Sequence, residues 1–337
     1  MMVTALVSSI LADVPVVAMM FPVALFLLQQ NKCPVGESPF GKAVMLGIAL
    51  AALIGGVGTP AGSGTNILTI NMLENAAHVS VSFFQWTAIG MPMVLLLTPV
   101  AWWALIKVYP PEIQHLVGME SIGEDYARLG PLSRKEKCFL LFLSINLLLW
   151  CSSGAHGLPL PTAAVLGCVL FALPGVGLIT WEEDRSKIGW DILFLVGTAS
   201  SLGMALWENG TATWIANACL GGLNALPLTV VIALVSLFTI LIHLVIPVNT
   251  PIVTVVLPPV VAIAVSMGIN PAILAVPLGF SVSAAVLLPL DAVSLVTYQA
   301  GYYKMYDMFK PGIIISIAWI IITTALMYLI AAPLDLM

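Results

Sequence analysis

Nine apolar stretches run along the chain, and their lengths constrain the fold more than any other feature of the sequence. They are residues 1–29, 42–78, 82–106, 138–153, 159–178, 188–207, 226–267, 271–303 and 311–334. A helix needs about 20 mainly apolar residues to cross about 30 Å of hydrocarbon. Inside hydrocarbon every backbone polar group must be paired within the protein, which a helix achieves locally. The sequence therefore predicts an all-α polytopic membrane protein.

Composition excludes a water-soluble protein. Hydrophobic residues make up 60% of the 337 residues and charged residues 8%, whereas an average soluble domain has about 25% charged residues. The five cysteines form no CxxC pair, so we interpret them as apolar packing residues rather than disulfides or metal ligands. The expected location is the cell (inner or plasma) membrane, with the lipid bilayer as partner and no nucleic acid.

The positions of the basic residues predict how the chain crosses the bilayer. All eleven Lys and Arg residues lie near 32–42, 107–137, 185–187 and 304–310. Loops that carry Lys and Arg are normally cytoplasmic. These loops fall on one side of the membrane if segments 1–29 and 226–267 each return to the side from which they entered. Both segments are therefore predicted to be re-entrant hairpins.

The middle of segment 226–267 favours a hairpin over two ordinary spans joined by a turn, which would give the same topology. Residues 246–251 are uncharged and place an Asn-Thr pair between two prolines, which opens the backbone inside an apolar run. In the first hairpin, Asp13 precedes Val14 and Pro15. An offset of 236 residues pairs Asp13 with Asn249 and Pro15 with Pro251.

Each hairpin leads into a long apolar segment that polar or helix-breaking residues interrupt, at 55–66 and at 289–294. A hairpin followed by a broken helix, twice and from opposite faces, indicates an inverted repeat. The first repeat is predicted at 1–106, with hairpin 1–29, broken helix 42–78 and span 82–106. A cytoplasmic loop at 107–137 separates it from the second repeat at 138–337. That repeat contains scaffold spans within 138–225, hairpin 226–267, broken helix 271–303 and a last span at 311–334.

The helix breaks predict an anion site that has no cationic side chain. Helix N-termini that meet near the middle of the membrane attract anions, and no Lys or Arg lies in the interior of a predicted span. Carbonyl groups at opposing C-termini suit Na⁺. The polar side chains expected to contribute are those of Ser63, Thr65, Asn66, Asn249, Thr250 and Ser294. The alternative for the glycine-rich stretch at 55–66 is close packing between helices.

Asp13 and Asp291 are carboxylates within apolar segments, which makes them candidates for a functional site. The alternative is that each caps freed backbone N–H groups. His243 lies six residues before Asn249. It is a candidate proton relay, and the alternative is a packed, hydrogen-bonded histidine.

Several motifs resemble the divalent anion:sodium symporter family of di- and tricarboxylate transporters, within the ion-transporter superfamily. The blocks that carry the resemblance are 12–22, 41–66, 190–203, 248–258, 268–271 and 301–308. Among them, 41–66 is similar to the family's GKA…GIA…IGG…GT…GTPPN pattern. The likeness covers essentially the whole chain, but only about the last three-quarters of a typical family member.

The resemblance implies two Na⁺ sites with substrate carboxylates between them. The first Na⁺ site falls on Ser8, Asp13 and Gly62, and the second on Asn249, Leu290 and Asp291. The implied substrate contacts are Val14, Gly64, Thr65, Asn66, Asn249, Thr250, Ala292 and Val293. The chain departs from the family pattern where Asp13 and Asp291 replace an amide and a hydroxyl. The added negative charge leads us to expect Na⁺ or H⁺ at these two residues.

The predicted function is secondary active transport of a small di- or tricarboxylate by an elevator-type mechanism, coupled to Na⁺ or H⁺, with no cofactor besides the coupling ion. Sodium-independent carboxylate exchange is one alternative. Another is a truncated, non-transporting fragment or an accessory subunit, because scaffold helices precede the first hairpin in the family. A homodimer is expected if such helices are supplied. An enzyme is not expected, since no catalytic motif such as HExxH is present.

Overall fold

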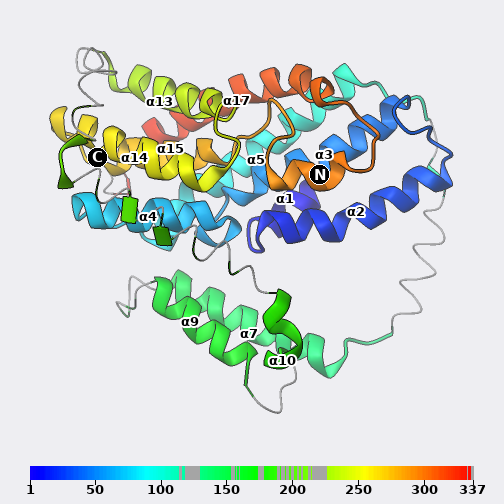
Figure 1. Ribbon diagram of the computed structural model, residues 1–337, viewed down its shortest axis with the longest axis horizontal. Helices are drawn as coiled ribbons and strands as arrows, with labels where there is room; N and C mark the ends of the chain where they lie inside the picture. The colour runs from blue at the N-terminus through cyan, green and yellow to red at the C-terminus, as the bar shows by residue number, and fades with distance from the viewer. Residues whose placement is uncertain are drawn as a thin grey trace. The chain divides into compact units, whose positions relative to one another are not determined.

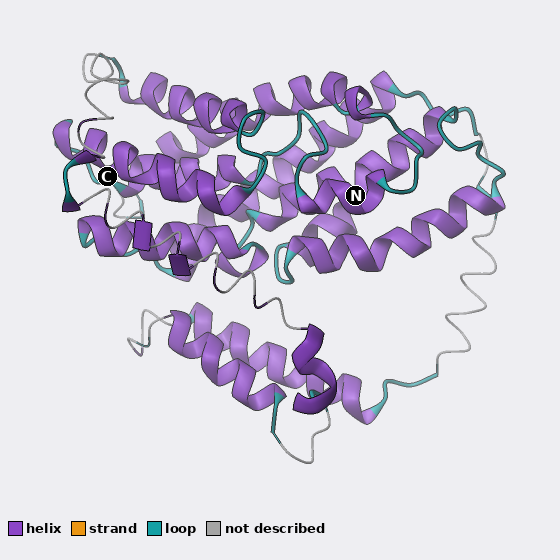
Figure 2. Cartoon of the chain, viewed as in Figure 1, coloured by secondary structure: helices purple, strands orange, loops and turns teal. Residues whose placement is uncertain are grey.

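The computed structural model describes residues 1–113, 116–117, 130–152, 160–173, 178–187, 226–331 and 333–334, together with single positions between 156 and 214. In these parts of the chain, every regular element is a helix (Figures 1 and 2). This confirms the predicted all-α class. Five of the helices are long and apolar enough to cross a membrane: Asp13–Gln30, Pro39–Gly56, Phe83–Val108, Asn249–Ser266 and Met305–Ile330. Multiple crossings agree with an integral, multi-pass membrane protein.

The main α-helices are, in chain order, α1 (Met2–Ser8), α2 (Asp13–Gln30), α3 (Pro39–Gly56), α4 (Gly64–Ala77), α5 (Phe83–Val108), α7 (Arg134–Cys151), α9 (Leu160–Phe171), α10 (Trp181–Asp184), α13 (Leu228–Ile242), α14 (Asn249–Ser266), α15 (Ala272–Val282), α16 (Ala292–Tyr298) and α17 (Phe309–Ile330). Short 3₁₀ helices lie at η1 (Pro60–Gly62), η2 (Arg185–Lys187) and η4 (Met305–Asp307).

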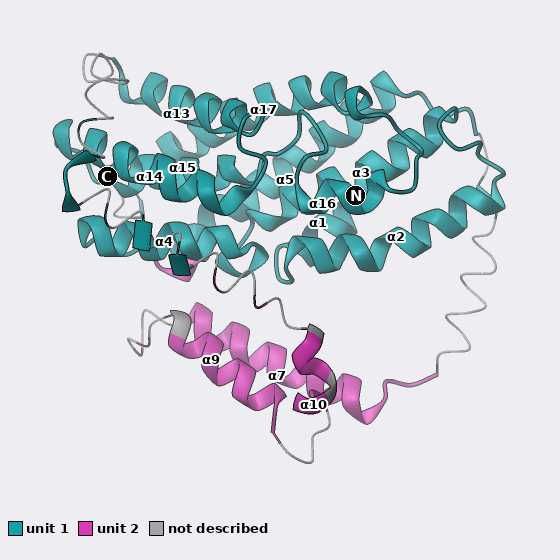
Figure 3. Ribbon diagram, in the orientation of Figure 1, with its two compact units in different colours: residues 1–81, 85–117, 196–337 teal, residues 82–84, 118–195 magenta. Residues whose placement is uncertain are grey.

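The chain divides into two compact units (Figure 3). Unit 1 contains residues 1–81, 85–117 and 196–337, and unit 2 contains residues 82–84 and 118–195. In unit 2, α7 packs against α9. Helix α7 begins with a capping box in which Ser133 and Glu136 bond each other's backbone N–H groups. Most of the predicted span 188–207 lies outside the described residues.

Both predicted hairpins contain two helices joined by a short turn. Helices α1 and α2 flank residues 9–12, and α13 and α14 flank residues 243–248. Helix α2 begins at Asp13 and α14 begins at Asn249, the two positions that the offset of 236 pairs, and each helix is 18 residues long. Their re-entrant path in a bilayer stays a prediction.

Both predicted broken helices are interrupted. The first leaves α-helical geometry after Gly56, forms the short η1 turn and resumes as α4 at Gly64. The second ends at Val282, earlier than the sequence predicts, and resumes as α16 at Ala292. The long segment 283–291 passes directly against α17. A methyl group added to Gly312 would lie 2.2 Å from the Val286 carbonyl oxygen.

Helices from the two halves of unit 1 interlock. Helix α16 packs on α2 and α3, while α4 packs on α14 and α15. Figure 3 labels both groups, with α4 beside α14 and α16 beside α3. The helix that follows each break therefore packs against the hairpin of the other half, α16 on α2 and α4 on α14. This exchange brings the two hairpin turns and the two helix breaks into one region of unit 1.

Candidate functional site

The first predicted ion site is assembled by the turn between α1 and α2 and the break after α3. A methyl group added to Gly62 would lie 2.5 Å from the Gly56 carbonyl oxygen and 2.9 Å from the Ser8 carbonyl oxygen. One added to Gly56 would lie 3.5 Å from the Asp13 carboxylate oxygen Oδ2. Ser8, Asp13 and Gly62, which the family resemblance implies to form one site, thus lie together. Oxygen atoms of this kind are the ligands that suit Na⁺.

Asn66 holds the first break in shape. Its Nδ2 donates to the carbonyl oxygens of Gly56, at 2.7 Å, and Thr59, at 2.9 Å. Because only the nitrogen of an amide donates, these two bonds fix which way the side chain faces. The Oδ1 atom is buried and accepts no hydrogen bond from the described residues. A buried acceptor of this kind has a polar group or cation as its natural partner.

Asp13 and Asp291 lie at two helix N-termini, Asp13 as the first residue of α2 and Asp291 as the residue before α16. The Asp13 side chain accepts from the Val14 amide at 2.9 Å, and Asp291 accepts from the Val293 amide at 3.1 Å. Asp291 therefore caps α16, whereas Asp13 bonds the amide of the next residue in α2. Asp13 and Asp291 are nevertheless 8% and 7% exposed, and they lie close enough to repel each other electrostatically. Two buried carboxylates in mutual range oppose each other's ionisation unless a cation or a proton neutralises them.

The predicted substrate contacts fall into two groups. Val14, Gly64 and Ala292 are exposed residues in the first turns of α2, α4 and α16. These turns carry backbone N–H groups that have no partner inside the helix. The second group, Thr65, Asn66, Thr250 and Val293, is buried. Asn249 is partly exposed and is the first residue of α14. The exposed positions are therefore the ones that a dissolved anion reaches directly.

The second predicted ion site is organised by His243, which follows α13. Its Nε2 lies 2.8 Å from the Val282 carbonyl oxygen and 3.2 Å from Asn249 Oδ1. Its Nδ1 lies 2.9 Å from the Thr239 carbonyl oxygen. The imidazole thus joins the end of α13, the start of α14 and the break after α15. Asp291 is within electrostatic range of the same ring.

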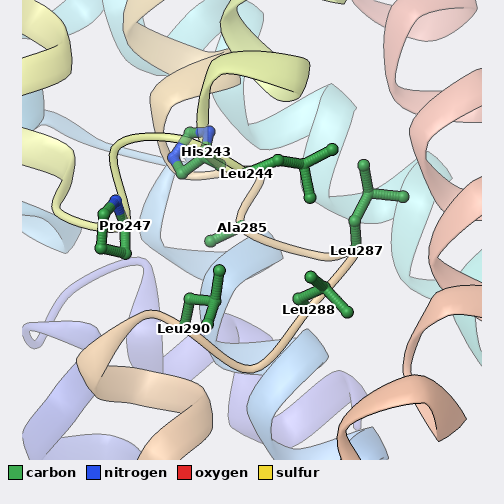
Figure 4. Close-up of a pocket in the computed structure, with 7 residues that line it drawn as sticks. All are labelled: His243, Leu244, Pro247, Ala285, Leu287, Leu288 and Leu290. Carbon is green, nitrogen blue, oxygen red and sulfur yellow. The ribbon is translucent and has the colours of Figure 1, made fainter.

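A small cavity of about 10 Å³ lies beside His243 (Figure 4). Its lining residues come from the hairpin turn and from the extended segment after α15, and they are His243, Leu244, Pro247, Ala285, Leu287, Leu288 and Leu290. This volume is about that of one water-sized sphere. The cavity is far too small for a dicarboxylate in the conformation described here.

The sequence also matches a known family of membrane proteins. Residues 3–336 match the model of the sodium:sulfate symporter transmembrane region. The chain belongs to this family. The match confirms the resemblance that the sequence motifs indicate.

Several relatives of this symporter family have names that describe them further. A membrane protein of Cupriavidus necator is 28% identical over 76% of the chain and 51% of its own length. The sodium-dependent dicarboxylate transporter SdcS of Staphylococcus saprophyticus is 24% identical over 99% and 68%. The sodium-dependent low-affinity dicarboxylate transporter 1 of Caenorhabditis elegans is 23% identical over 85% and 55%. The chain thus spans about half to two-thirds of the length of these symporter relatives.

Two features of this candidate site were not predicted from the sequence. The first is the proximity of Asp13 and Asp291, which are 278 residues apart in the sequence (291 − 13). The second is the contact between His243 and Asn249. The spacing of six residues was a signal for this contact, because a hairpin turn of that length returns the chain close to the helix end. Val282, whose carbonyl oxygen also contacts His243, is 39 residues away, and no sequence pattern indicates this contact.

Proposed function

We propose that this protein is a secondary active transporter, and not an enzyme, that carries a small dicarboxylate across the membrane together with Na⁺. The observation that carries the proposal is the pair of buried carboxylates, Asp13 and Asp291, at the starts of α2 and α16 within reach of each other's charge. Membership of a symporter family supports transport. The names of two relatives, both sodium-dependent dicarboxylate transporters, support the substrate class and the ion.

The electrostatics of the site explain why an anion and a cation would bind together. Exposed first turns of helices offer N–H groups to a carboxylate, but two ionised aspartates nearby oppose an anion. Cations bound at Asp13 and Asp291 remove this repulsion. The affinity for the substrate then depends on the coupling ion, which is the property that a symporter requires.

Alternating access by an elevator-type movement, with the protein as a homodimer, completes this proposal. It rests on the resemblance to the carboxylate transporters and on the interlocked helices of unit 1, which are suited to move as one body. Helices α4 and α16 each bind the opposite half, so a displacement of one hairpin carries the other with it. Cross-linking of the purified protein at low concentration tests the dimer.

The direct experiment measures uptake of labelled succinate into proteoliposomes. We expect an inward Na⁺ gradient to drive accumulation above equilibrium, and an equal K⁺ gradient to leave it at equilibrium. Accumulation driven by a proton gradient without Na⁺ would assign the coupling to H⁺. The same vesicles loaded with unlabelled succinate test for exchange. Uptake that depends on internal substrate and on neither ion would contradict symport and establish an exchanger. No uptake under any condition would contradict transport itself.

A further inference from the structure

His243 is a buried polar side chain to which the proposed transport function assigns no role. It is 5% exposed and lies between α13, the first residue of α14 and the last residue of α15. Three oxygen atoms surround its two ring nitrogens at 2.8–3.2 Å. A side chain that only filled space would not need three polar partners at one junction.

The identities of these partners fix where the hydrogens are. The partner atoms on Val282 and Thr239 are backbone carbonyl oxygens, which accept hydrogen bonds and never donate them. The shortest of these contacts, 2.8 Å between Nε2 and the Val282 carbonyl oxygen, therefore places a hydrogen on Nε2.

A hydrogen on Nε2 decides the orientation of the Asn249 amide. The oxygen Oδ1 faces the ring at 3.2 Å and accepts from it. The opposite orientation would place the amide NH₂ group against another donor, which is repulsive. The two hydrogens on Nδ2 are consequently directed away from His243. Asn249 is partly exposed and is the first residue of α14.

We propose that His243 is a positioning residue for the substrate, which holds the Asn249 amide so that it presents NH₂ and not oxygen to a bound carboxylate. This inference rests on the proposed function. The two amide hydrogens add to the free backbone N–H groups in the first turn of α14, so one helix start supplies several donors to one anion. With its oxygen occupied, Asn249 acts on the substrate rather than as a ligand of the cation.

The first test compares two substitutions of His243 in proteoliposomes that contain the full chain. His243→Leu removes the donor, and we expect the KM for succinate to rise about tenfold, the effect of losing one hydrogen bond. The maximal rate should change less than twofold, because the fold and the moving parts are intact. His243→Gln keeps an N–H donor and should recover most of the affinity. His156→Leu, an exposed histidine in unit 2, is the control and should leave the KM unchanged.

A double-mutant cycle tests whether His243 acts through Asn249. In the Asn249→Ala background there is no amide to orient, so His243→Leu should raise the KM less than twofold further. An additive, tenfold effect in that background would overturn the positioning role. Equal KM values for His243→Gln and His243→Leu would overturn it as well.

Asn249→Asp provides a separate reading if His243→Leu fails to fold. The aspartate keeps an acceptor for His243 but presents oxygen to the substrate in place of NH₂. We expect its KM to rise at least as much as that of Asn249→Ala. A KM equal to that of the unsubstituted protein would overturn the inference. Absence of succinate transport by the unsubstituted protein would instead overturn the proposed function, and the positioning role with it.

Discussion

Single glycines determine how closely α1 and α3 approach each other. A methyl group on Gly55 would lie 2.2 Å from the Ala5 carbonyl oxygen, which is far inside van der Waals contact. The hydroxyl of Ser9 bonds the carbonyl oxygens of both Ala5 and Gly55, at 2.9 and 3.0 Å. Small residues at helix contacts allow this kind of close backbone approach within membranes. Gly55 therefore sets the position of the first hairpin turn relative to the first helix break.

Gly55→Ala should destabilise the protein by about 1–3 kcal/mol, because the added methyl group forces α1 away from α3. The thermal unfolding midpoint in detergent measures the effect. Gly64→Ala is the matched control, since a methyl group there meets no atom within 4 Å, and its midpoint should not fall. Equal midpoints for the two variants would show that α1 and α3 do not depend on this contact.

Asp13→Asn tests the cation role of the first carboxylate. The substitution keeps the size and the acceptor oxygen but removes the charge. We expect the Na⁺ concentration for half-maximal succinate uptake to rise at least about tenfold, because a carboxylate is replaced by a neutral ligand. Glu37 is an exposed carboxylate in the loop before α3, and Glu37→Gln should leave this Na⁺ concentration unchanged. Unaltered Na⁺ dependence in Asp13→Asn would show that the ion binds elsewhere.

At the scale of elements, the segment that follows α5 is tied to the loops that begin α3 and α17. Lys42 and Asp307 form an ion pair at 2.9 Å, and Tyr109 donates to the Asp307 carbonyl oxygen at 2.6 Å. The Glu112 carboxylate accepts hydrogen bonds from the Ser38 hydroxyl and from the Phe40 amide. This group of contacts joins three loops on the side that the basic residues predict to be cytoplasmic.

The Glu112 contact predicts a stability that depends on pH. Partial burial by itself raises the pKa of this carboxyl, but hydrogen bonds from Ser38 and Phe40 outweigh it and hold the pKa below its usual value. The contact therefore stabilises the folded state above about pH 4.3, the usual pKa of glutamate. The stabilisation is lost as the pH falls through the lowered pKa of the folded state.

Glu112→Gln should consequently lower the thermal unfolding midpoint at pH 7, and the difference from the unsubstituted protein should shrink as the pH falls below about 4.3. Unfolding curves in detergent at a series of pH values measure this difference. In the Ser38→Ala background the substitution should have a smaller effect, because one of the donors has been removed. A difference that stays constant over the pH range would contradict a role for the ionised carboxyl.

At the scale of the whole molecule, the predicted hairpins determine which residues can be reached from water. The turn at 243–248 carries no Lys, Arg, Asp or Glu, and a re-entrant turn ends inside the membrane region. Cysteine labelling distinguishes this path from two full spans. The measurement requires a background in which the five native cysteines have been replaced.

In that background, Val248→Cys should resist a bulky, membrane-impermeant maleimide in inside-out vesicles, because the turn does not reach the cytosolic solvent. Lys304→Cys, in an exposed loop predicted to be cytoplasmic, should be labelled in the same vesicles. Small permeant reagents should label both. Labelling of Val248→Cys at the rate of Lys304→Cys would show that 226–267 forms two ordinary spans.

Local sequence was sufficient where a property depends on neighbouring residues. Proline and polar residues inside apolar runs identified both helix–turn–helix pairs and both helix breaks, and the starts of α2 and α14 fall on the paired positions Asp13 and Asn249. The clustering of Ser8, Asp13 and Gly62 agrees with what the family resemblance implies. The second break was placed too late, because the residues from Ser283 to Leu288 are apolar or small and contain no proline.

The sequence by itself thus determined the membrane class, the order of helices and breaks, and the residue types available for an ion and a carboxylate. These features follow from the length of each apolar run and from breakers within it, which are properties of contiguous residues. Only the tertiary structure decided that α16 packs on α2 and α3, that α4 packs on α14 and α15, and that Asp13 approaches Asp291. All spans are similarly apolar, and lipid is as apolar as they are, so the detailed fit of side chains selects the partner of each helix.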